Sequence, residues 1–386
     1  MEIIAFAFGN PQDSQTWSNV PYFAVNTLEK MGHTVHCVDI LPQSAFVKKM
    51  IKATNKAMRL ILGKDTLLLV ELWPLLRHYY DGVIKRVCRE YSSADLLLFF
   101  TYSLSSKGIT NTPSVLFNDF TIDYVIRELH KRDPKWYEKK LIKSQDQIIK
   151  NADCVISLFP KAAQYYRDYY KTDNIFEISG HILNCDENIA DLDSIIQTKY
   201  ESKEILFIGR KSYKNGALCL IDAIKRYNSL HPEAALHLSI IGMTEEVLGI
   251  NRSPDVICHG ILNKSRTEQK TLYYDTIRKA KCVVNTTKNW GGISSMSESM
   301  YFVTPVITTP YSEFVEIFGK TIDFGYYCTG EDVPELVDKL HQLMSLSKEK
   351  YACLSRCAHE SVKDFTWENC MKQILEYAQK GENVAK

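Results

Sequence analysis

Two cations placed directly after a buried strand are candidates for holding a diphosphate. The apolar run Glu204–Ile208 is followed by Gly209, Arg210 and Lys214. An arginine presents a planar fork of donors to phosphate oxygens, and a lysine presents a compact positive charge. We therefore expect these residues to neutralise a diphosphate. A solvated loop of the same composition is the alternative that this pattern leaves open.

A second candidate segment, NWGGISSMSESM, combines glycines with the start of a predicted helix. Glycines let a backbone approach a ligand closely, and free N–H groups with the helix dipole attract anions to a helix N-terminus. A glutamate further along the helix can accept hydrogen bonds from the two hydroxyls of a ribose. The residues expected at this site are Gly291, Gly292, Ile293, Ser294 and Glu298. A glycine-containing turn before an ordinary helix is the alternative.

The elements that must position these residues follow one rhythm in both halves of the chain, in which short apolar runs alternate with longer amphipathic ones. Apolar strands separated by helices are typical of a parallel sheet covered on both faces. The predicted strands are Glu2–Phe8, Thr34–Asp39, Asp95–Phe100, Pro113–Phe117, Cys154–Leu158, Asn174–Ile178, Glu204–Ile208, Ala235–Ile241, Val256–Cys258, Cys282–Asn285, Pro305–Thr308 and Thr321–Phe324. Helices are predicted over Val20–Met31, Asn215–Tyr227 and Glu268–Lys279, among others.

A polar and acidic segment, CDENIADLDS, interrupts this rhythm and indicates a linker. We place the linker at 186–202, between an N-terminal domain over 1–185 and a C-terminal domain over 203–365. The expected fold class is α/β, with two Rossmann-like, doubly wound domains. Sheets of this kind bind ligands beyond the carboxyl ends of their strands, so two facing sheets imply a cleft between the domains.

Composition limits the classes of protein to consider. The chain has 386 residues, which favours two domains, and its net charge of +1 gives no support for nucleic-acid binding. The 11 cysteines include no CxxC pair, so we expect buried thiols in a reducing cytosol and no structural zinc. The opening MEIIAFAFGN resembles a first strand more than a signal peptide. No apolar run approaches the about 20 residues of a membrane-spanning helix.

These motifs together resemble the donor half of retaining glycosyltransferase family 4, which has the GT-B fold. The resemblance rests on Arg210, Lys214 and Glu298, on the TPVI strand that follows, and on Glu316. It implies that the two cations contact the donor diphosphate and that Glu298 binds the nucleotide ribose. It places Glu316 near the sugar or the diphosphate, with a helix-surface carboxylate as the alternative. The family has a further glutamate eight positions before Glu298, where this chain has Trp290.

The resemblance extends to the first half and to the end of the chain. QTWSNVPYFAVNTLEKMGHTV resembles the family's opening and implies that the loop with Gly9, Trp17, Ser18 and Asn19 faces the donor phosphates or the acceptor. PSVLFNDF places Asp119 where the family has a His or Asp that faces the reacting sugar, although a helix N-cap is the alternative. FTWENCMKQILEYAQ resembles the terminal helix, implying that 366–386 returns to the first domain.

The resemblance implies transfer of a hexosyl unit from a UDP- or GDP-linked sugar to a glycan or lipid-linked acceptor, with retention. No DxD motif lies near the site, so no metal and no cofactor beyond the substrate is expected. Asp119, Arg210 and Lys214 are the expected catalytic residues. A nucleotide-sugar epimerase or a glycan phosphorylase is the enzymatic alternative. A pseudoenzyme that binds nucleotide-sugar or glycan without turnover is the other, because Trp290 replaces a carboxylate.

A basic amphipathic helix is predicted over 46–64, a segment without Asp or Glu. Its cations interleave with apolar residues, which is typical of helices that lie on anionic membranes. Several members of the family use such a helix to reach lipid-linked acceptors. We therefore expect a cytoplasmic protein that contacts the membrane surface peripherally through this helix. A helix packed on the sheet with a solvated lysine face is the alternative.

Overall fold

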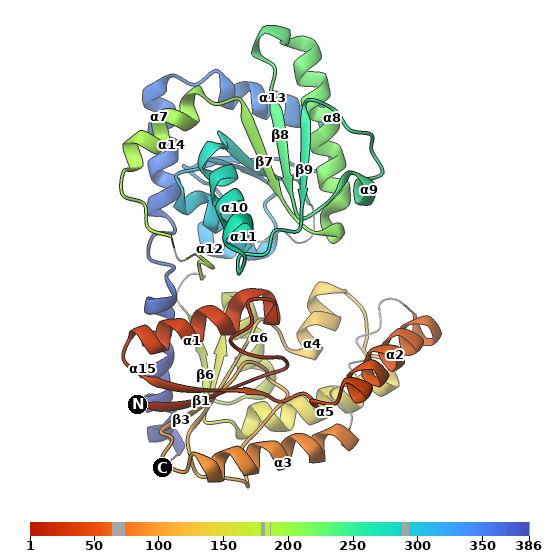
Figure 1. The fold of residues 1–386 in the computed structure, drawn as a ribbon, viewed down its shortest axis with the longest axis vertical. Coiled ribbons are helices and arrows are strands. Elements are labelled where there is room, and N and C mark those ends of the chain that lie inside the picture. Colours follow the sequence, from red (N-terminus) through yellow and green to blue (C-terminus); the bar gives the residue numbers. More distant parts are fainter. Residues whose placement is uncertain (64–73, 179–181, 186, 288–292, 386) are drawn as a thin grey trace. The chain divides into compact units, whose positions relative to one another are not determined.

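The computed structural model describes residues 1–63, 74–178, 182–185, 187–287 and 293–385. Contacts within the chain divide it into two compact units. The first comprises Met1–Ser179 with Trp367–Lys386, and the second comprises Gly180–Thr366. Each unit is built on one six-stranded sheet with helices on its faces (Figure 1). The predicted α/β class with two Rossmann-like sheets is confirmed.

The first unit has the strand order β2-β1-β3-β4-β5-β6, and all neighbouring strands run parallel. The order reverses between β1 and β3, and ligands of open α/β sheets bind at such a switch point. The strands are β1 (Glu2–Ala7), β2 (Thr34–Asp39), β3 (Leu96–Phe99), β4 (Ser114–Asn118), β5 (Cys154–Ser157) and β6 (Ile175–Glu177). The helices are α1 (Val20–Lys30), α2 (Ala45–Leu62), α3 (Pro74–Glu90), α4 (Ile122–Tyr124), α5 (Trp136–Asn151) and α6 (Pro160–Tyr170).

The last helix, α15 (Trp367–Ala385), completes the first unit. It packs against α1 and against strands β4 and β5. The indole of Trp367 stacks on Phe23 of α1, with ring centroids 6.4 Å apart, and meets Phe117 of β4 edge-on. Tyr377 stacks on Phe176 of β6 with a centroid separation of 4.8 Å. A segment distant in sequence therefore covers strands β4 and β5 of this sheet.

The second unit has the strand order β12-β11-β10-β7-β8-β9, again with parallel neighbours. Its switch point lies between β7 and β10, as in the dinucleotide-binding fold. The strands are β7 (Glu204–Ile208), β8 (His237–Ile241), β9 (Val256–Gly260), β10 (Cys282–Asn285), β11 (Val306–Thr308) and β12 (Gly325–Tyr327). The helices are α7 (Leu192–Glu201), α8 (Lys214–Leu230), α9 (Glu245–Leu248), α10 (Thr267–Lys279), α11 (Ile293–Tyr301), α12 (Ser312–Phe318), α13 (Val333–Met344) and α14 (Lys348–Glu360).

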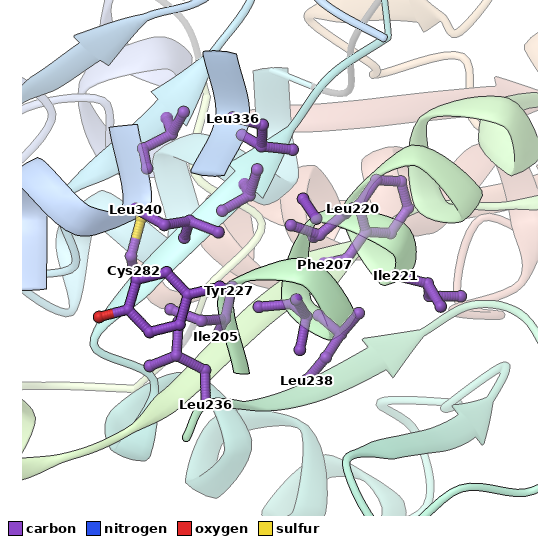
Figure 2. Packing of buried hydrophobic residues seen from close by; sticks show 14 of the residues in the cluster. Ile205, Phe207, Leu220, Ile221, Tyr227, Leu236, Leu238, Cys282, Leu336 and Leu340 are labelled. Carbon is purple, nitrogen blue, oxygen red and sulfur yellow. The ribbon is translucent and has the colours of Figure 1, made fainter. Parts of the chain in front are cut away.

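The core of the second unit explains why its central strand is apolar from Ile205 to Ile208. Successive side chains of a strand point to opposite faces, yet Ile205, Leu206 and Phe207 of β7 are all fully buried. Both faces are therefore covered. Phe207 packs with Leu220 of α8 and Leu336 of α13 in one cluster (Figure 2). Helices α8 and α13 also pack against each other.

One predicted strand differs from the structure, and a helix forms within the predicted linker. The strand predicted at Thr321–Phe324 is wrong, because β12 occupies Gly325–Tyr327 instead. A Cβ at Gly325 would lie 2.0 Å from the carbonyl oxygen of Val306, so the glycine allows β12 to approach β11 and does not end the strand. Within the predicted linker 186–202, Leu192–Glu201 forms α7, whose first turn is capped by Asp191. The contact division falls ahead of that segment, between Ser179 and Gly180.

The 11 cysteines are all free thiols. No helix in the described part of the chain is long and apolar enough to cross a membrane.

Candidate functional site

The end of β7 is shaped by a close crossing of two backbone segments. The N–H of Gly209 donates to the carbonyl oxygen of Ile241 over 2.9 Å. Gly242 has a φ of +103°, and a Cβ there would lie 2.4 Å from the carbonyl oxygen of Gly209. Only glycine fits such a position without displacing backbone. This crossing fixes the direction in which the chain leaves β7 and enters Arg210.

Arg210 and Lys214 follow this crossing at the switch point of the sheet. Arg210 is exposed, and Lys214 is half-buried at the start of α8. Neither side chain has a carboxylate within ion-pair distance in the described part of the chain. Two cations without an internal counter-ion at the carboxyl edge of a parallel sheet are well placed to bind an external anion. The structure therefore places both predicted cations at one edge of the second unit.

The end of β10 contacts the start of α8. The hydroxyl of Thr286 donates to the carbonyl oxygen of Gly216 over 2.9 Å. A Cβ at Gly216 would lie 3.0 Å from the Oγ1 atoms of both Thr286 and Thr287, so the lack of a side chain allows this approach. The first turn of α8 and the loop after β10 therefore lie against each other, on the two strands that flank the switch point.

Glu298 is held in a buried polar cluster on α11. Only 3% of this residue is exposed. Its Oε2 atom accepts hydrogen bonds from the ammonium group of Lys264 and from the hydroxyl of Tyr273, the latter over 2.8 Å. Burial raises the pKa of Tyr273 well above its usual range, and the charge of Glu298 raises it further, so this hydroxyl is a donor at neutral pH. Oε1 of Glu298 has no hydrogen-bond partner among the described residues.

Lys264 ties this cluster to the segment that enters the second unit. Its ammonium group also donates to the carbonyl oxygen of Asn184 over 2.9 Å. It lies 4.4 Å from the ring centroid of Tyr273 and 5.5 Å from that of Tyr274, within the range of cation–π attraction. The sequence interpretation did not identify Lys264 or Tyr273. A buried glutamate in a helix needs a cation or a donor, and that requirement is the signal that could have led to them.

Some of the remaining residues predicted to bind the sugar donor lie outside the described residues, and the others lie on α11 and α12. Trp290, Gly291 and Gly292 lie outside the described residues. Ile293 is buried at the first position of α11, and Ser294 beside it is half-buried. Glu316 is half-buried on α12, which follows β11. The structure thus brings Glu316 to the loops at the carboxyl ends of the strands, and its role there stays a prediction.

In the first unit, Asp119 and Trp17 meet after β4. The indole Nε1 of Trp17 donates to Oδ2 of Asp119 over 3.3 Å. Burial raises the pKa of Asp119 to about 6, and the hydrogen bond from Trp17 opposes that shift. In α4 the first turn is capped by the side chain of Thr121, which accepts from the N–H of Tyr124. The alternative of Asp119 as the N-cap of this helix is therefore wrong.

The loop after β1 carries backbone strain at the predicted positions. Trp17, Ser18 and Asn19 have φ angles of +38°, +54° and +72°, a region that costs a non-glycine residue about 1–3 kcal/mol. Contacts of the Trp17 indole oppose this strain, since it packs edge-on against Phe100 and Phe117 as well as binding Asp119. Consecutive strained residues beside a half-buried carboxyl at a strand end are typical of a functional site.

Gly9 supports the same loop from its other end. It has a φ of +118°, and its N–H donates to Oδ1 of Asp39 over 3.0 Å. A Cβ at Gly9 would lie 2.9 Å from Oγ1 of Thr16, whose hydroxyl donates to the carbonyl oxygen of Asn10. The loop is therefore closed on itself near the switch point between β1 and β3. Among the described residues, no group of three or more His, Cys, Asp or Glu side chains is arranged to hold a metal ion.

Comparison with protein families gives a match that lies within the second unit. Residues 202–345 match the family described as Glycosyl transferases group 1. This range contains Arg210, Lys214, Glu298 and Glu316. No curated protein sequence gives a significant match.

Solved structures of similar fold include several glycosyltransferases. Sucrose-phosphate synthase from Thermosynechococcus elongatus has a TM-score of 0.64 at 16% identity, with 100% of each chain covered. HepE from Anabaena, solved with UDP-glucose, has a TM-score of 0.61 at 14% identity, covering 98% of this chain and 100% of that one. TarM has a TM-score of 0.55 at 17% identity, and the match covers 78% of this chain but 58% of TarM. At these identities the likeness shows the fold, which is GT-B.

Proposed function

We propose that this chain is a retaining, metal-independent glycosyltransferase of family 4 that moves a hexosyl unit from a nucleoside-diphosphate sugar to a glycan or lipid-linked acceptor. One observation carries the proposal. Arg210 and Lys214 stand without a described counter-ion at the switch point of the second sheet, inside the segment that matches the group 1 glycosyl transferases. A diphosphate is the anion that such a pair fits.

The chemistry follows from charge that develops on the leaving diphosphate. As the bond to the sugar breaks, the β-phosphate gains negative charge, and Arg210 and Lys214 stabilise it without reorganising. The departing phosphate then takes the proton of the acceptor hydroxyl, which attacks from the same face of the sugar. This route retains the anomeric configuration and needs no side-chain nucleophile. In this mechanism Arg210 and Lys214 neutralise the diphosphate, which is the role of a metal ion in other transferases.

Glu298 is proposed to bind the ribose of the donor through its remaining oxygen. Lys264 and Tyr273 occupy Oε2 and fix the carboxylate, which leaves Oε1 for a ribose hydroxyl. A carboxylate held in one orientation loses little freedom when a ligand binds. HepE was solved with UDP-glucose, and TarM from S. aureus was also solved with UDP, which supports a uridine or related nucleotide here.

Asp119 and the loop Gly9–Asn19 are proposed to act on the sugar or the acceptor from the first unit. Trp17 holds the Asp119 carboxyl by one hydrogen bond, so its other oxygen can orient a hydroxyl. With a pKa of about 6, Asp119 is a carboxylate at neutral pH and accepts hydrogen bonds from hydroxyl groups. Ser18 and Asn19 supply polar groups in the same strained turn.

Helix α2 is proposed to contact an anionic membrane surface that carries a lipid-linked acceptor. Ile51 is buried, and Met58 and Leu62 pack on a small core of the first unit. The rest of the helix is unusually apolar for an exposed surface, because Phe46, Met50, Leu60 and Ile61 are 70%, 53%, 77% and 76% exposed. Exposed lysines at 49, 52 and 56 and Arg59 accompany them. Lys64, at the end of the predicted helix, lies outside the described residues.

A binding subunit without turnover is the second candidate. It is favoured by Trp290, which stands where the resemblance expects a carboxylate. Titration of the full chain with UDP-, GDP- and ADP-sugars, followed by a donor hydrolysis assay, separates the two. Turnover of one donor supports the transferase. Binding without turnover in an acceptor screen supports the binding subunit, and no binding of any donor rejects both.

A further inference from the structure

Three buried polar atoms without a partner follow strands β10 and β11 in the second unit. They are Oγ1 of Thr287, the hydroxyl of Tyr311 and Oε2 of Glu313, none of which has a hydrogen-bond partner in the described part of the chain. Tyr311 and Glu313 are each 3% exposed. Leaving a buried polar atom unpaired is destabilising, and most of all for a carboxylate. Such atoms in one region indicate that an absent ligand supplies the missing hydrogen bonds.

Contacts between the loops place these atoms at one edge of the sheet. The hydroxyl of Thr309, directly after β11, donates to the carbonyl oxygen of Thr287 over 2.5 Å and so joins the loops after β11 and β10. Burial raises the pKa of Tyr311 well above its usual range, and the nearby Tyr213 and Glu313 raise it further. Tyr213 belongs to the turn after β7 that also carries Arg210.

The same edge holds the cations proposed to bind the diphosphate. Thr287 lies against Gly216 in the first turn of α8, and Lys214 begins that turn. The unpaired atoms therefore adjoin the diphosphate site. We therefore expect the group that is bonded to the diphosphate to contact the unpaired atoms of Thr287, Tyr311 and Glu313.

The types of the unpaired atoms define the ligand that fits. A carboxylate accepts hydrogen bonds, and two hydroxyls both accept and donate, so a group with several neutral hydroxyls satisfies all three. No lysine, arginine or histidine lies within ion-pair distance of Glu313 among the described residues. A ligand carboxylate placed beside the Glu313 carboxyl group would find no cation within ion-pair distance of that group, which is unfavourable.

We propose that Thr287, Tyr311 and Glu313 bind the hydroxyls of the donor's sugar, and that Glu313 selects a neutral hexose over a hexuronate. This inference rests on the proposed function and names the donor class within it. It also gives the site a carboxylate for the sugar, which the sequence lacks at position 290.

The test compares three probes on the full chain by calorimetry: UDP, UDP-glucose and UDP-glucuronate, with the matching GDP compounds in parallel. Wild type should bind the neutral sugar nucleotide at least tenfold more tightly than the uronate. Glu313→Gln should keep the affinity for the free diphosphate within twofold and reduce the preference for the neutral sugar at least fivefold. Tyr311→Phe should weaken binding of the neutral sugar nucleotide and leave that of the free diphosphate unchanged. Asp338→Asn, an exposed residue of α13, is the matched control and should change nothing.

Thermal unfolding distinguishes this role from a structural one. Because Oε2 of Glu313 has no hydrogen-bond partner among the described residues, Glu313→Gln breaks no bond to this atom and is expected to be at least as stable as wild type. A lower melting temperature together with equal losses for all three probes would show that Glu313 is structural and overturn the inference. An unchanged preference in a stable Glu313→Gln variant would overturn it too, and the proposed function would stand. If wild type binds neither free diphosphates nor sugar nucleotides, the proposed function itself fails, and this inference fails with it.

Discussion

The ammonium group of Lys264 donates a hydrogen bond to Oε2 of Glu298, and the two side chains are only 11% and 4% exposed. Charges withdrawn from water in this way depend on each other, because neither keeps a compensating solvent shell. Tyr273 satisfies the same oxygen, so the carboxylate has one fixed orientation. The pair therefore affects both the folding of the second unit and the binding of a ribose.

Replacing Lys264 by Met should destabilise the protein by about 3 kcal/mol, because it leaves the Glu298 carboxylate buried with no cation. Urea unfolding followed by circular dichroism measures this loss. The double variant Lys264→Met/Glu298→Leu should recover much of the stability, yet bind the nucleotide at least tenfold more weakly than wild type. Lys279→Met, on an exposed end of α10, should stay within about 0.5 kcal/mol of wild type. Equal stability of Lys264→Met and Lys279→Met would contradict the dependence of Glu298 on its partner.

Arg210→Ala should lower turnover about 100-fold, as expected when one group that stabilises developing charge is removed. Since Arg210 is exposed, the unfolding curve of the variant should match that of wild type. Lys225→Ala, an exposed lysine further along α8, is the control for lost positive charge and should keep full turnover. Steady-state donor hydrolysis measures the effect. A loss of stability in place of turnover would show that the cation has a structural role.

The pKa of Asp119, raised to about 6 by burial, predicts opposite pH profiles for stability and activity. Folding favours the protonated carboxyl, so its contribution to stability is full below pH 4 and is lost as the pH rises through about 6. Turnover should rise over the same range, because the carboxylate is the proposed acceptor of sugar or acceptor hydroxyls. Asp119→Asn should flatten the stability profile and remove the rise in turnover.

Unfolding measured from pH 4 to 8, with turnover in the same buffers, checks the Asp119 profiles. Asp153→Asn is a poor control because it breaks hydrogen bonds at the start of β4. Asp168→Asn in α6 is the control, because Asp168 is exposed and its only described hydrogen bond comes from Gln164 on the surface. An Asp119→Asn variant with the pH profile of wild type would assign the titration to another group.

Gly242→Ala should destabilise the second unit by more than about 2 kcal/mol, because its positive φ and its contact with Gly209 both exclude a Cβ. The displaced backbone should also carry Arg210 away from its position and weaken nucleotide binding. Gly82→Ala, inside α3 with no atom near the added Cβ, should instead stabilise by about 0.5–1 kcal/mol. Thermal unfolding of both variants distinguishes steric exclusion from a general effect of the substitution.

Charge reversal of the lysines at 49, 52 and 56 should abolish binding of the protein to anionic vesicles, since each cation near such a surface contributes about 1 kcal/mol. The same change at lysines 139, 143 and 150 of α5 gives a variant with the same net charge as the α2 variant, and it should have little effect on vesicle binding. Flotation with vesicles of phosphatidylserine and phosphatidylcholine at low salt is the measurement. If wild type does not float with the vesicles, α2 has no membrane role.

The strands and the cations at the end of β7 could be predicted from the sequence because each is marked by a pattern of neighbouring residues. Ile205–Ile208 is apolar throughout and is followed by Gly209 and Arg210, so a short window contains the strand, its end and its charge. The helix over Leu192–Glu201 was hidden by an acidic composition typical of linkers. It forms because Asp191 caps it and because Ile196 and Lys199 are buried against the rest of the unit.

The partners of Glu298 could not be predicted from the sequence, for a different reason. Lys264 and Tyr273 lie on a loop and a helix that precede α11 by many residues, and only the folded sheet brings them together. Gly325 shows the same limit, since its contact with Val306 depends on the pairing of two strands. Glycine in a sequence window indicates a turn, whereas here it permits a close approach inside a sheet.

The position of α15 in the first unit affects the order in which the protein matures on the ribosome. Trp367 and the residues after it cover strands β4 and β5 of a sheet that is synthesised before the entire second unit. The second unit can therefore finish folding while the first still exposes the surfaces of α1, β4 and β5 that α15 covers. During that interval these apolar surfaces stay open to water and to other chains, and a truncation before Trp367 would leave them so permanently.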